Sequence, residues 1–271
     1  MPRKRKLTTE DLYKFQLIAD VQISPDGQSV LFTNTKFHPD RKKNTYISHI
    51  WRVFSSGGTP TQFTGSSESE SNPRWCPDGS EILFLSARDA EEERKGKTQL
   101  WLIPSTGGEA RKISNEKHGV SSPRWSPDGR SILFLTRVPV EPGRDKLPRE
   151  KETDVVHIRR ISYRMNGGDY HHEFRTHLHI IPARGGKSRQ ITKGDWSVES
   201  FTWSADGTRI YFTGNITEDT DYTYRRNLYS IPTSGGRART LCGLPGHLSS
   251  PESSPDGKKV AFVGNDRKRG N

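Results

Sequence analysis

The sequence predicts an all-β fold, a β-propeller of four-stranded antiparallel blades, and three observations carry that prediction. A short turn motif recurs five times along the 271 residues, and a Gly-Gly pair recurs in phase with it. Only 30% of the residues are hydrophobic, and the mean hydropathy is −0.86. So polar a chain suits short strands with many turns. A period near 50 residues with four strands per unit is typical of a propeller blade.

The turn motif has the form Ser-Pro-Asp-Gly, with Cys or Ala replacing one residue in two copies. Proline presets φ at the first turn position, aspartate bonds the local backbone, and glycine takes a positive φ. The second positions lie 52, 50, 78 and 50 residues apart, and the Gly-Gly pairs lie 50, 78 and 50 apart. Two markers with the same offsets establish the repeat. The turns are Ser24–Gly27, Cys76–Gly79, Ser126–Gly129, Ser204–Gly207 and Ser254–Gly257, and the pairs begin at Gly57, Gly107, Gly185 and Gly235.

The second repeat shows the four strands of one unit. Pro73–Trp75 runs into the turn, and Glu81–Leu85 returns from it as a nearly continuous apolar run, which indicates burial on both faces. Gln99–Ile103 is the third strand. Ala110–Ser114 is more polar, as suits an outer edge. The matching third strands are His49–Phe54, His177–Ile181 and Asn227–Ile231, and the tryptophans expected in the core at one repeat position are Trp75, Trp125 and Trp203.

The repeats set the domain organisation. Residues 1–20 form an N-terminal segment, in which Thr9–Ala19 is predicted to hold one short helix capped by Thr8 or Thr9. Residues 21–271 form a partial propeller, with four blades, part of a fifth and an incomplete ring. An insertion at about 138–173 divides into a charged loop, 139–154, and an extra hairpin, 155–163.

An incomplete ring has consequences for association. The last expected strand, Val260–Val263, would lack a stacking neighbour, and unpaired apolar edges are templates for association. We therefore expect the isolated chain to form a homo-oligomer or to aggregate.

Charge and composition exclude several partners. The net charge is +11, but the basic residues are scattered and are interrupted by acidic stretches such as 89–93. Nucleic acid is therefore not expected as a partner, and the basic run Pro2–Lys6 is interpreted as a solvated tail. No stretch approaches the ~20 apolar residues of a membrane span, and no signal-peptide core follows the N-terminus. We expect no membrane partner and a cytoplasmic location.

No catalytic, cofactor-binding or metal-ligating residue is assigned, and no cofactor is expected. The histidines at 171, 172, 177 and 179 suggest a metal site, but no cysteine or paired carboxylate completes the set, so they are interpreted as strand or surface histidines. Cys76 takes a repeat position that is elsewhere serine and is expected to pack, while Cys242 has no metal-type spacing. The aspartates Asp78, Asp128 and Asp256 are expected in solvent-facing turns.

A basic and aromatic patch lies within the insertion. It is interpreted either as a solvated hairpin or as a contact to a peptide carboxylate or to a catalytic domain, because arginine can hold a carboxylate bidentately. The patch comprises Arg159, Arg160, Tyr163 and Arg164.

The order of these segments resembles a known family. Thr9–Tyr13, the Ile23–Gly27 turn, Pro73–Gly79 and Leu100–Pro104 together resemble the N-terminal propeller of the prolyl oligopeptidase family, in its acylaminoacyl-peptidase and dipeptidyl-aminopeptidase branch. The insertion, from Asp154 to Tyr170, is similar to a segment typical of that branch. Tol-type propellers share the turn motif alone.

The resemblance implies an α/β-hydrolase domain after the propeller, with a Ser-Asp-His triad, and short or N-acylated peptides as substrates. No Gly-x-Ser-x-Gly nucleophile elbow occurs up to Asn271, so we expect a truncated chain that lacks the catalytic domain and is inactive alone. The propeller would then limit access to short peptides. The alternative is a stand-alone Tol-type propeller that serves as a protein-binding scaffold.

Overall fold

The computed structural model describes residues 5–88, 97–140, 161, 174–217, 223 and 225–266. The chain divides into two compact units, each of which is described by itself. The first comprises Met1–Trp125 with Arg184–Gly186, and the second comprises Ser126–Ala183 with Lys187–Asn271.

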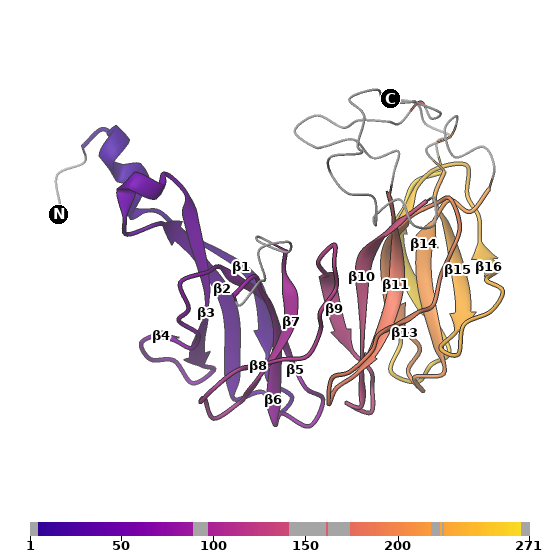
Figure 1. Cartoon of the computed structure of the whole chain (residues 1–271), viewed down its shortest axis with the longest axis horizontal. Coiled ribbons are helices and arrows are strands. Elements are labelled where there is room, and N and C mark those ends of the chain that lie inside the picture. Colours follow the sequence, from indigo (N-terminus) through magenta and orange to yellow (C-terminus); the bar gives the residue numbers. More distant parts are fainter. Residues whose placement is uncertain are drawn as a thin grey trace, which may run out of the picture. The chain divides into compact units, whose positions relative to one another are not determined.

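Two four-stranded antiparallel sheets form the first unit, in the orders β1-β2-β3-β4 and β5-β6-β7-β8 (Figure 1). Each sheet follows chain order, as expected of strands joined by tight turns. The elements are η1 (Thr9–Lys14), β1 (Gln16–Ile23), β2 (Ser29–Phe37), η2 (Arg41–Lys43), β3 (Tyr46–Phe54), β4 (Thr61–Gln62), β5 (Glu70–Trp75), β6 (Glu81–Ser86), β7 (Gln99–Pro104) and β8 (Arg111–Lys112), followed by β9 (Ser121–Trp125) at the end of the unit.

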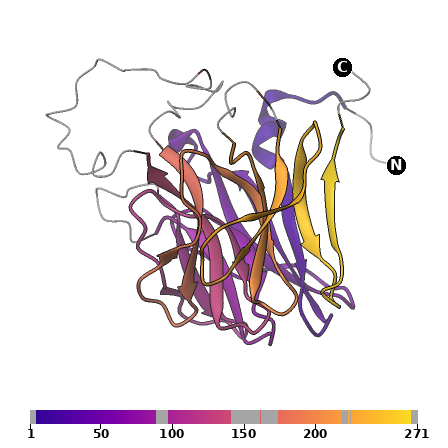
Figure 2. The ribbon, with the colours of Figure 1, turned by 90° about the vertical axis from the view of Figure 1, so that its right-hand side faces the viewer.

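The second unit continues the same pattern. A four-stranded sheet, β13-β14-β15-β16, follows the strands of the third repeat, and a two-stranded sheet, β17-β18, follows it (Figure 2). The predicted blades and the first half of a fifth are thereby confirmed. The strands are β10 (Ser131–Pro139), β11 (Phe174–Pro182), β12 (Arg189–Gln190), β13 (Val198–Trp203), β14 (Arg209–Gly214), β15 (Asn227–Pro232), β16 (Arg239–Cys242), β17 (Leu248–Ser253) and β18 (Val260–Gly264).

The N-terminal segment differs from the prediction. Only Thr9–Lys14 is helical, as a 3-10 helix, and β1 begins at Gln16, before the predicted boundary at residue 21. The Asp11 carboxylate accepts the backbone N–H of Thr8 at 2.9 Å, which anchors this first turn. The residues that follow pair with β2, and the register shifts between Ala19 and Gln22, where Asp20 takes a φ of 51°. Pairing with a neighbouring strand has therefore overridden the helical pattern.

The insertion begins and ends at one strand pair. β10 and β11 pair along nine positions, from Ser131 with Pro182 to Pro139 with Phe174. The predicted loop and hairpin between these ends lie outside the described residues, apart from residues 140 and 161.

Each unit has its own apolar core, formed mainly by the second and third strands of the sheets. Trp125 and Trp203 are buried and Trp75 is half-buried, as predicted for this repeat position. The indole N–H of Trp75 donates to the carbonyl of Gln22, and that of Trp125 donates to the carbonyl of Arg74. Gln22 and Arg74 each lie three residues before the turn proline of the preceding repeat. The tryptophans therefore fix one repeat against the preceding one as well as filling the core.

Several apolar side chains of the first and last strands remain exposed. Leu17, Ile18, Val21 and Ile23 on β1 are each more than half exposed, and Val263 on β18 is 66% exposed. Val263 belongs to the segment Val260–Val263, on which the expected self-association depends, and that expectation stays a prediction. None of the helices in the described part of the chain has the length and apolar character that a membrane crossing requires.

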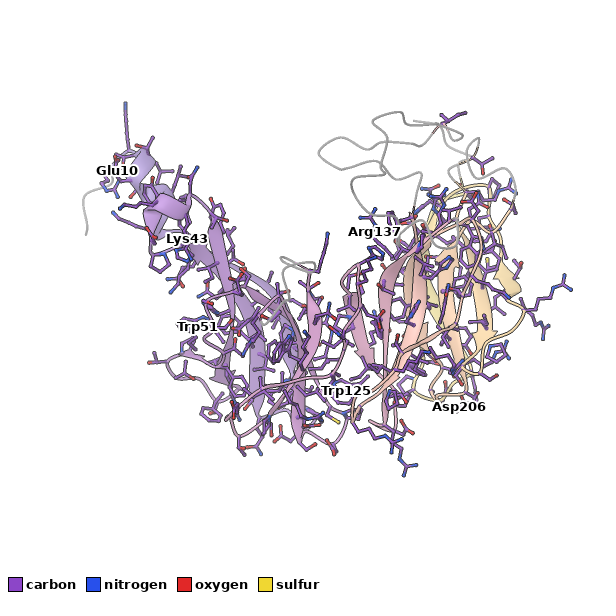
Figure 3. The ribbon with its side chains drawn as sticks, in the orientation of Figure 1. Glu10, Lys43, Trp51, Trp125, Arg137 and Asp206 are labelled. Carbon is purple, nitrogen blue, oxygen red and sulfur yellow. The ribbon has the colours of Figure 1, made fainter. Side chains whose placement is uncertain are left out.

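The Asp-Gly turns are solvent-facing, as predicted, and Figure 3 shows Asp206 in one of them. The carboxylate accepts the backbone N–H two residues later in all five copies, at 2.9 to 3.1 Å. At Asp78, hydrogen bonds from the Ser80 hydroxyl, from the Ser80 backbone N–H and from Cys76 lower the pKa to about 2. The turns are thus stabilised by the ionised carboxylate.

Replacing Asp78 with asparagine is expected to make the stability of the protein depend less steeply on pH below about pH 4. A folded-state pKa below the ordinary value contributes stability above about pH 4, and this stability is lost as the pH falls towards 2. Asparagine keeps the acceptor but has no charge to lose. Thermal unfolding of the wild type and the variant across this pH range tests the effect. Glu109→Gln, exposed and outside the turns, is the control, and an unchanged acid limb in Asp78→Asn would contradict the prediction.

Candidate functional site

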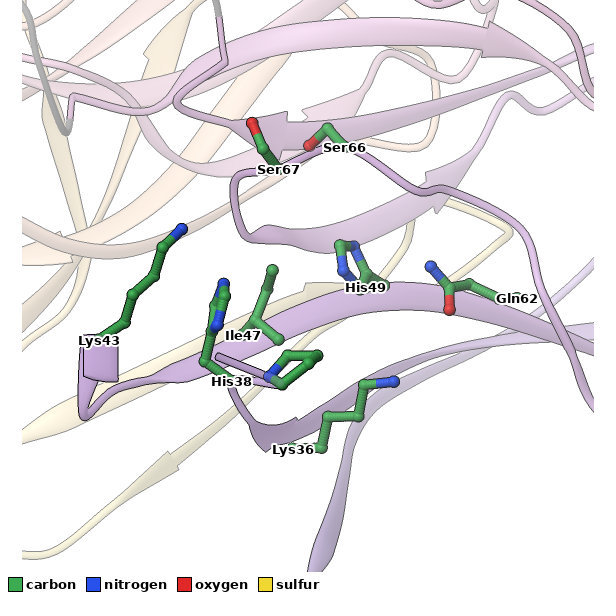
Figure 4. Close-up of a pocket in the computed structure, with 9 residues that line it drawn as sticks. Lys36, His38, Lys43, Ile47, His49, Gln62, Ser66 and Ser67 are labelled. Atoms are coloured by element: carbon green, nitrogen blue, oxygen red, sulfur yellow. The ribbon is translucent and has the colours of Figure 1, made fainter. Parts of the chain in front are cut away.

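A pocket of about 410 Å³ lies in the first unit, along β2, β3 and the segment after β4. Figure 4 shows Ser66 and Ser67 across this pocket from His38 and Ile47. No carboxylate is among its nine lining residues, two of which are lysines and two histidines. We call it the blade-1 pocket, and its lining comprises Lys36, His38, Pro39, Lys43, Ile47, His49, Gln62, Ser66 and Ser67.

A buried charge cluster lies beneath the pocket. His49 is 6% exposed, and its Nδ1 lies 2.9 Å from Oε2 of Glu70, which is fully buried. The other oxygen of Glu70 accepts from the guanidinium of Arg88. Burial by itself raises the pKa of Glu70, but hydrogen bonds from His49 and Thr64 and the charge of Arg88 outweigh it, and the net shift is downward. Glu70 is therefore a buried anion that orients the His49 ring.

Comparison between repeats explains why the pocket opens at His49. The equivalent residues, eight positions before each Gly-Gly pair, include Gln99 and His177. The Gln99 amide donates to the carbonyl of Glu116 at 2.8 Å, and the Nε2 of His177 bonds the carbonyl of Gly194 at 3.0 Å. In those two repeats the loop after the fourth strand covers the polar side chain.

The same loop does not cover His49. The position equivalent to Glu116 and Gly194 is Ser66, which lines the pocket. Within the described residues, Nε2 of His49 has no hydrogen-bond partner, since only its Nδ1 is bonded. The His49 side chain, which is only 8% exposed, thus presents a free nitrogen to the pocket.

His177 and His179 lie on the strand β11, where His177 is buried and His179 is half-buried. His177 is buried, bonds Thr192 and Gly194, and packs edge-on against Trp196. Burial lowers the pKa of His177, and burial with the nearby His177 charge lowers that of His179 to about 4. His171 and His172 lie outside the described residues. Over the part of the chain that is described, no group of three His, Cys, Asp or Glu side chains could hold a metal ion.

The other residues considered in the sequence are the two cysteines, which the structure describes, and the patch of the insertion, which it does not. Cys76 is buried, and burial with the hydrogen bond to Asp78 raises the pKa of its thiol to about 11, as suits a packing residue. Cys242 is half-buried, and both cysteines are free. The basic and aromatic patch of the insertion lies outside the described residues. The blade-1 pocket had no counterpart among the sequence candidates, because histidine also occurs at this repeat position in the third repeat, where the loop covers it.

Two family models match the chain. The TolB beta propeller domain matches residues 14–143, and the dipeptidyl peptidase IV N-terminal region matches residues 165–244. Among curated proteins, the uncharacterized peptidase YuxL of Bacillus subtilis is 29% identical over 224 residues, which is 80% of this chain. The chain spans only 32% of the length of that relative.

Solved structures agree on the fold. The acylaminoacyl peptidase of Pyrococcus horikoshii superposes with a TM-score of 0.69 and 19% identity, covering 95% of this chain and 37% of that one. TolB of Acinetobacter baumannii superposes with a TM-score of 0.55 and 17% identity, covering 90% of this chain and 48% of that one. The propeller repeat, the order of the two family models and the peptidase relative all support the resemblance to the N-terminal propellers of the prolyl oligopeptidase family.

Proposed function

We propose that the chain is the non-catalytic propeller portion of an acylaminoacyl-peptidase-like serine peptidase, and that it limits access of short peptides to an α/β-hydrolase domain. The observation that carries the proposal is the succession of the two family matches, in which the dipeptidyl peptidase IV N-terminal region follows the TolB-type repeats. In such an arrangement the propeller acts by steric exclusion, and the chemistry belongs to the hydrolase domain.

A TolB-type propeller that serves as a protein-binding scaffold is the second candidate. The match of residues 14–143 to the TolB domain supports it. The match of residues 165–244 to a peptidase region has no role in this alternative, which is why we favour the first.

Hydrolysis assays separate the two candidates. The 271-residue chain alone is expected to cleave no acylated peptide above background and to show no stoichiometric labelling by a fluorophosphonate probe. Joined to its hydrolase domain, it is expected to cleave short acylated peptides, with kcat/KM falling at least about tenfold for long ones, a loss of about 1.4 kcal/mol in transition-state stabilisation. Stoichiometric labelling of a serine in the chain alone would overturn the non-catalytic assignment. Equal cleavage of long and short peptides by the joined protein would overturn the gating role.

A further inference from the structure

We propose that the blade-1 pocket binds phosphate, either as the free ion or as the terminal group of a phosphate monoester. The proposal is independent of the peptidase assignment, because it depends only on residues of the first repeat. At about 410 Å³, the pocket is of the size that holds small ligands.

The charge of the lining favours an anion. Lys36 and Lys43 line the pocket, and neither ammonium group has an ion-pair partner among the described residues. No carboxylate lines the pocket to compete for them, and the buried carboxylate of Glu70 is already bound by His49 and Arg88. Two uncompensated cations around one concave site attract a dianion more strongly than a monoanion.

The hydrogen-bonding groups also match an oxyanion. Nδ1 of His38 accepts the backbone N–H of Asp40 at 3.0 Å, so the proton of the neutral ring is on Nε2, which can donate. Ser67 contributes a hydroxyl group from the opposite side. Nε2 of His38 and the Ser67 hydroxyl can therefore donate hydrogen bonds to the same oxyanion as the lysines.

His49 distinguishes phosphate from other anions. Because its Nδ1 donates to the ionised Glu70, the free Nε2 is an acceptor when the ring is neutral and a donor when it is protonated. At neutral pH the free phosphate ion carries at least one proton in both of its forms, and a phosphate monoester carries one in its monoanionic fraction, so either can donate to Nε2 as well as accept from the lysines. Sulfate and carboxylate groups are acceptors only at this pH. A buried, unpartnered imidazole acceptor among cations therefore favours phosphate.

Calorimetric titration of the 271-residue chain with inorganic phosphate, at pH 7 and low salt, tests the proposal. Saturable binding is expected, with methyl phosphate binding comparably if the monoester is accommodated and more weakly if only the free ion fits. Acetate and sulfate are expected to bind at least several-fold more weakly. The double variant Lys36→Gln/Lys43→Gln is expected to weaken phosphate binding by about tenfold or more, because it removes two charge-assisted hydrogen bonds.

Lys42→Gln is the matched control. It removes one lysine charge from an exposed neighbour of Lys43 that does not line the pocket, and phosphate binding is expected to change less than about twofold. His49→Gln, which installs the residue of the second repeat, is expected to reduce the preference for phosphate over sulfate. His49→Gln also alters the contact with Glu70 and so could affect folding. The lysine variants do not touch that contact, and the test therefore does not depend on His49→Gln alone. Absence of saturable binding at millimolar phosphate, equal losses in Lys42→Gln and the double variant, or equal affinity for sulfate and acetate would each overturn the proposal.

Discussion

Truncating Phe212 to alanine is expected to lower the free energy of unfolding by about 3–5 kcal/mol, as is usual when a fully buried aromatic side chain is lost. Phe212 has no exposed surface and lies in the cluster of the second unit with Leu133, Ile210 and Tyr229. Its ring stacks on Trp196 at 5.7 Å and on Tyr229 at 5.3 Å between centroids. Alanine would leave a cavity between two large rings, one in the loop before β13 and the other on β15, which cannot both move inward.

Chemical denaturation followed by tryptophan fluorescence measures this loss. Phe212→Leu fills much of the volume and is expected to lose markedly less than the alanine variant. Val263→Ala removes apolar atoms from a side chain that is 66% exposed, and a change within about 0.5 kcal/mol is expected. A loss in Phe212→Ala no larger than that in Val263→Ala would show that the stacked rings do not support the core.

The repeat made most of this fold predictable from sequence. Turn residues specify backbone conformations locally: Gly79 has a φ of 74°, and Gly57 and Gly58 have φ values of 98° and 118°. Once these turns were located, the apolar strands between them could be assigned by length and composition. The one clear error was the start of β1, where residues 16–19 have a pattern compatible with a helix. Their strand conformation depends on pairing with β2, whose partner residues lie 14 to 20 positions later in the chain.

The blade-1 pocket was not predictable in the same way. The sequence shows that His49 and His177 are equivalent, but not that the following loop bonds one ring and leaves the other uncovered. The difference arises from the path of residues 65–69 after β4, and loop paths are specified weakly by composition. The sequence also did not indicate that Glu70 is a buried anion. Its partner Arg88 lies 18 residues later, just after β6.

Replacing Glu70 with glutamine is expected to cost about 3 kcal/mol of folding stability, the usual consequence of removing one partner from a buried ion pair. Glutamine has nearly the same shape, so the loss reports the charge. Without it, the Arg88 guanidinium, which lies over Phe84 and Trp101, loses its buried counter-ion, and the Nδ1–H of His49 loses its ionised acceptor. Glu68→Gln, exposed and two residues earlier, is the control and should change stability by less than about 0.5 kcal/mol.

The pH dependence of the same variant gives a second measurement. The pKa of Glu70 in the folded state is below its ordinary value, so its ionised form adds stability above the ordinary glutamate range, and this stability is lost as the pH falls through the folded-state pKa. Glutamine cannot be protonated in this range, so the gap between wild type and Glu70→Gln is expected to be widest near pH 7 and to close in acid. A gap that stays constant down to the acid-unfolding limit would mean that glutamine disturbs packing instead of charge. Equal stability of the two proteins at pH 7 would mean that the buried carboxylate contributes nothing to the fold beneath the blade-1 pocket.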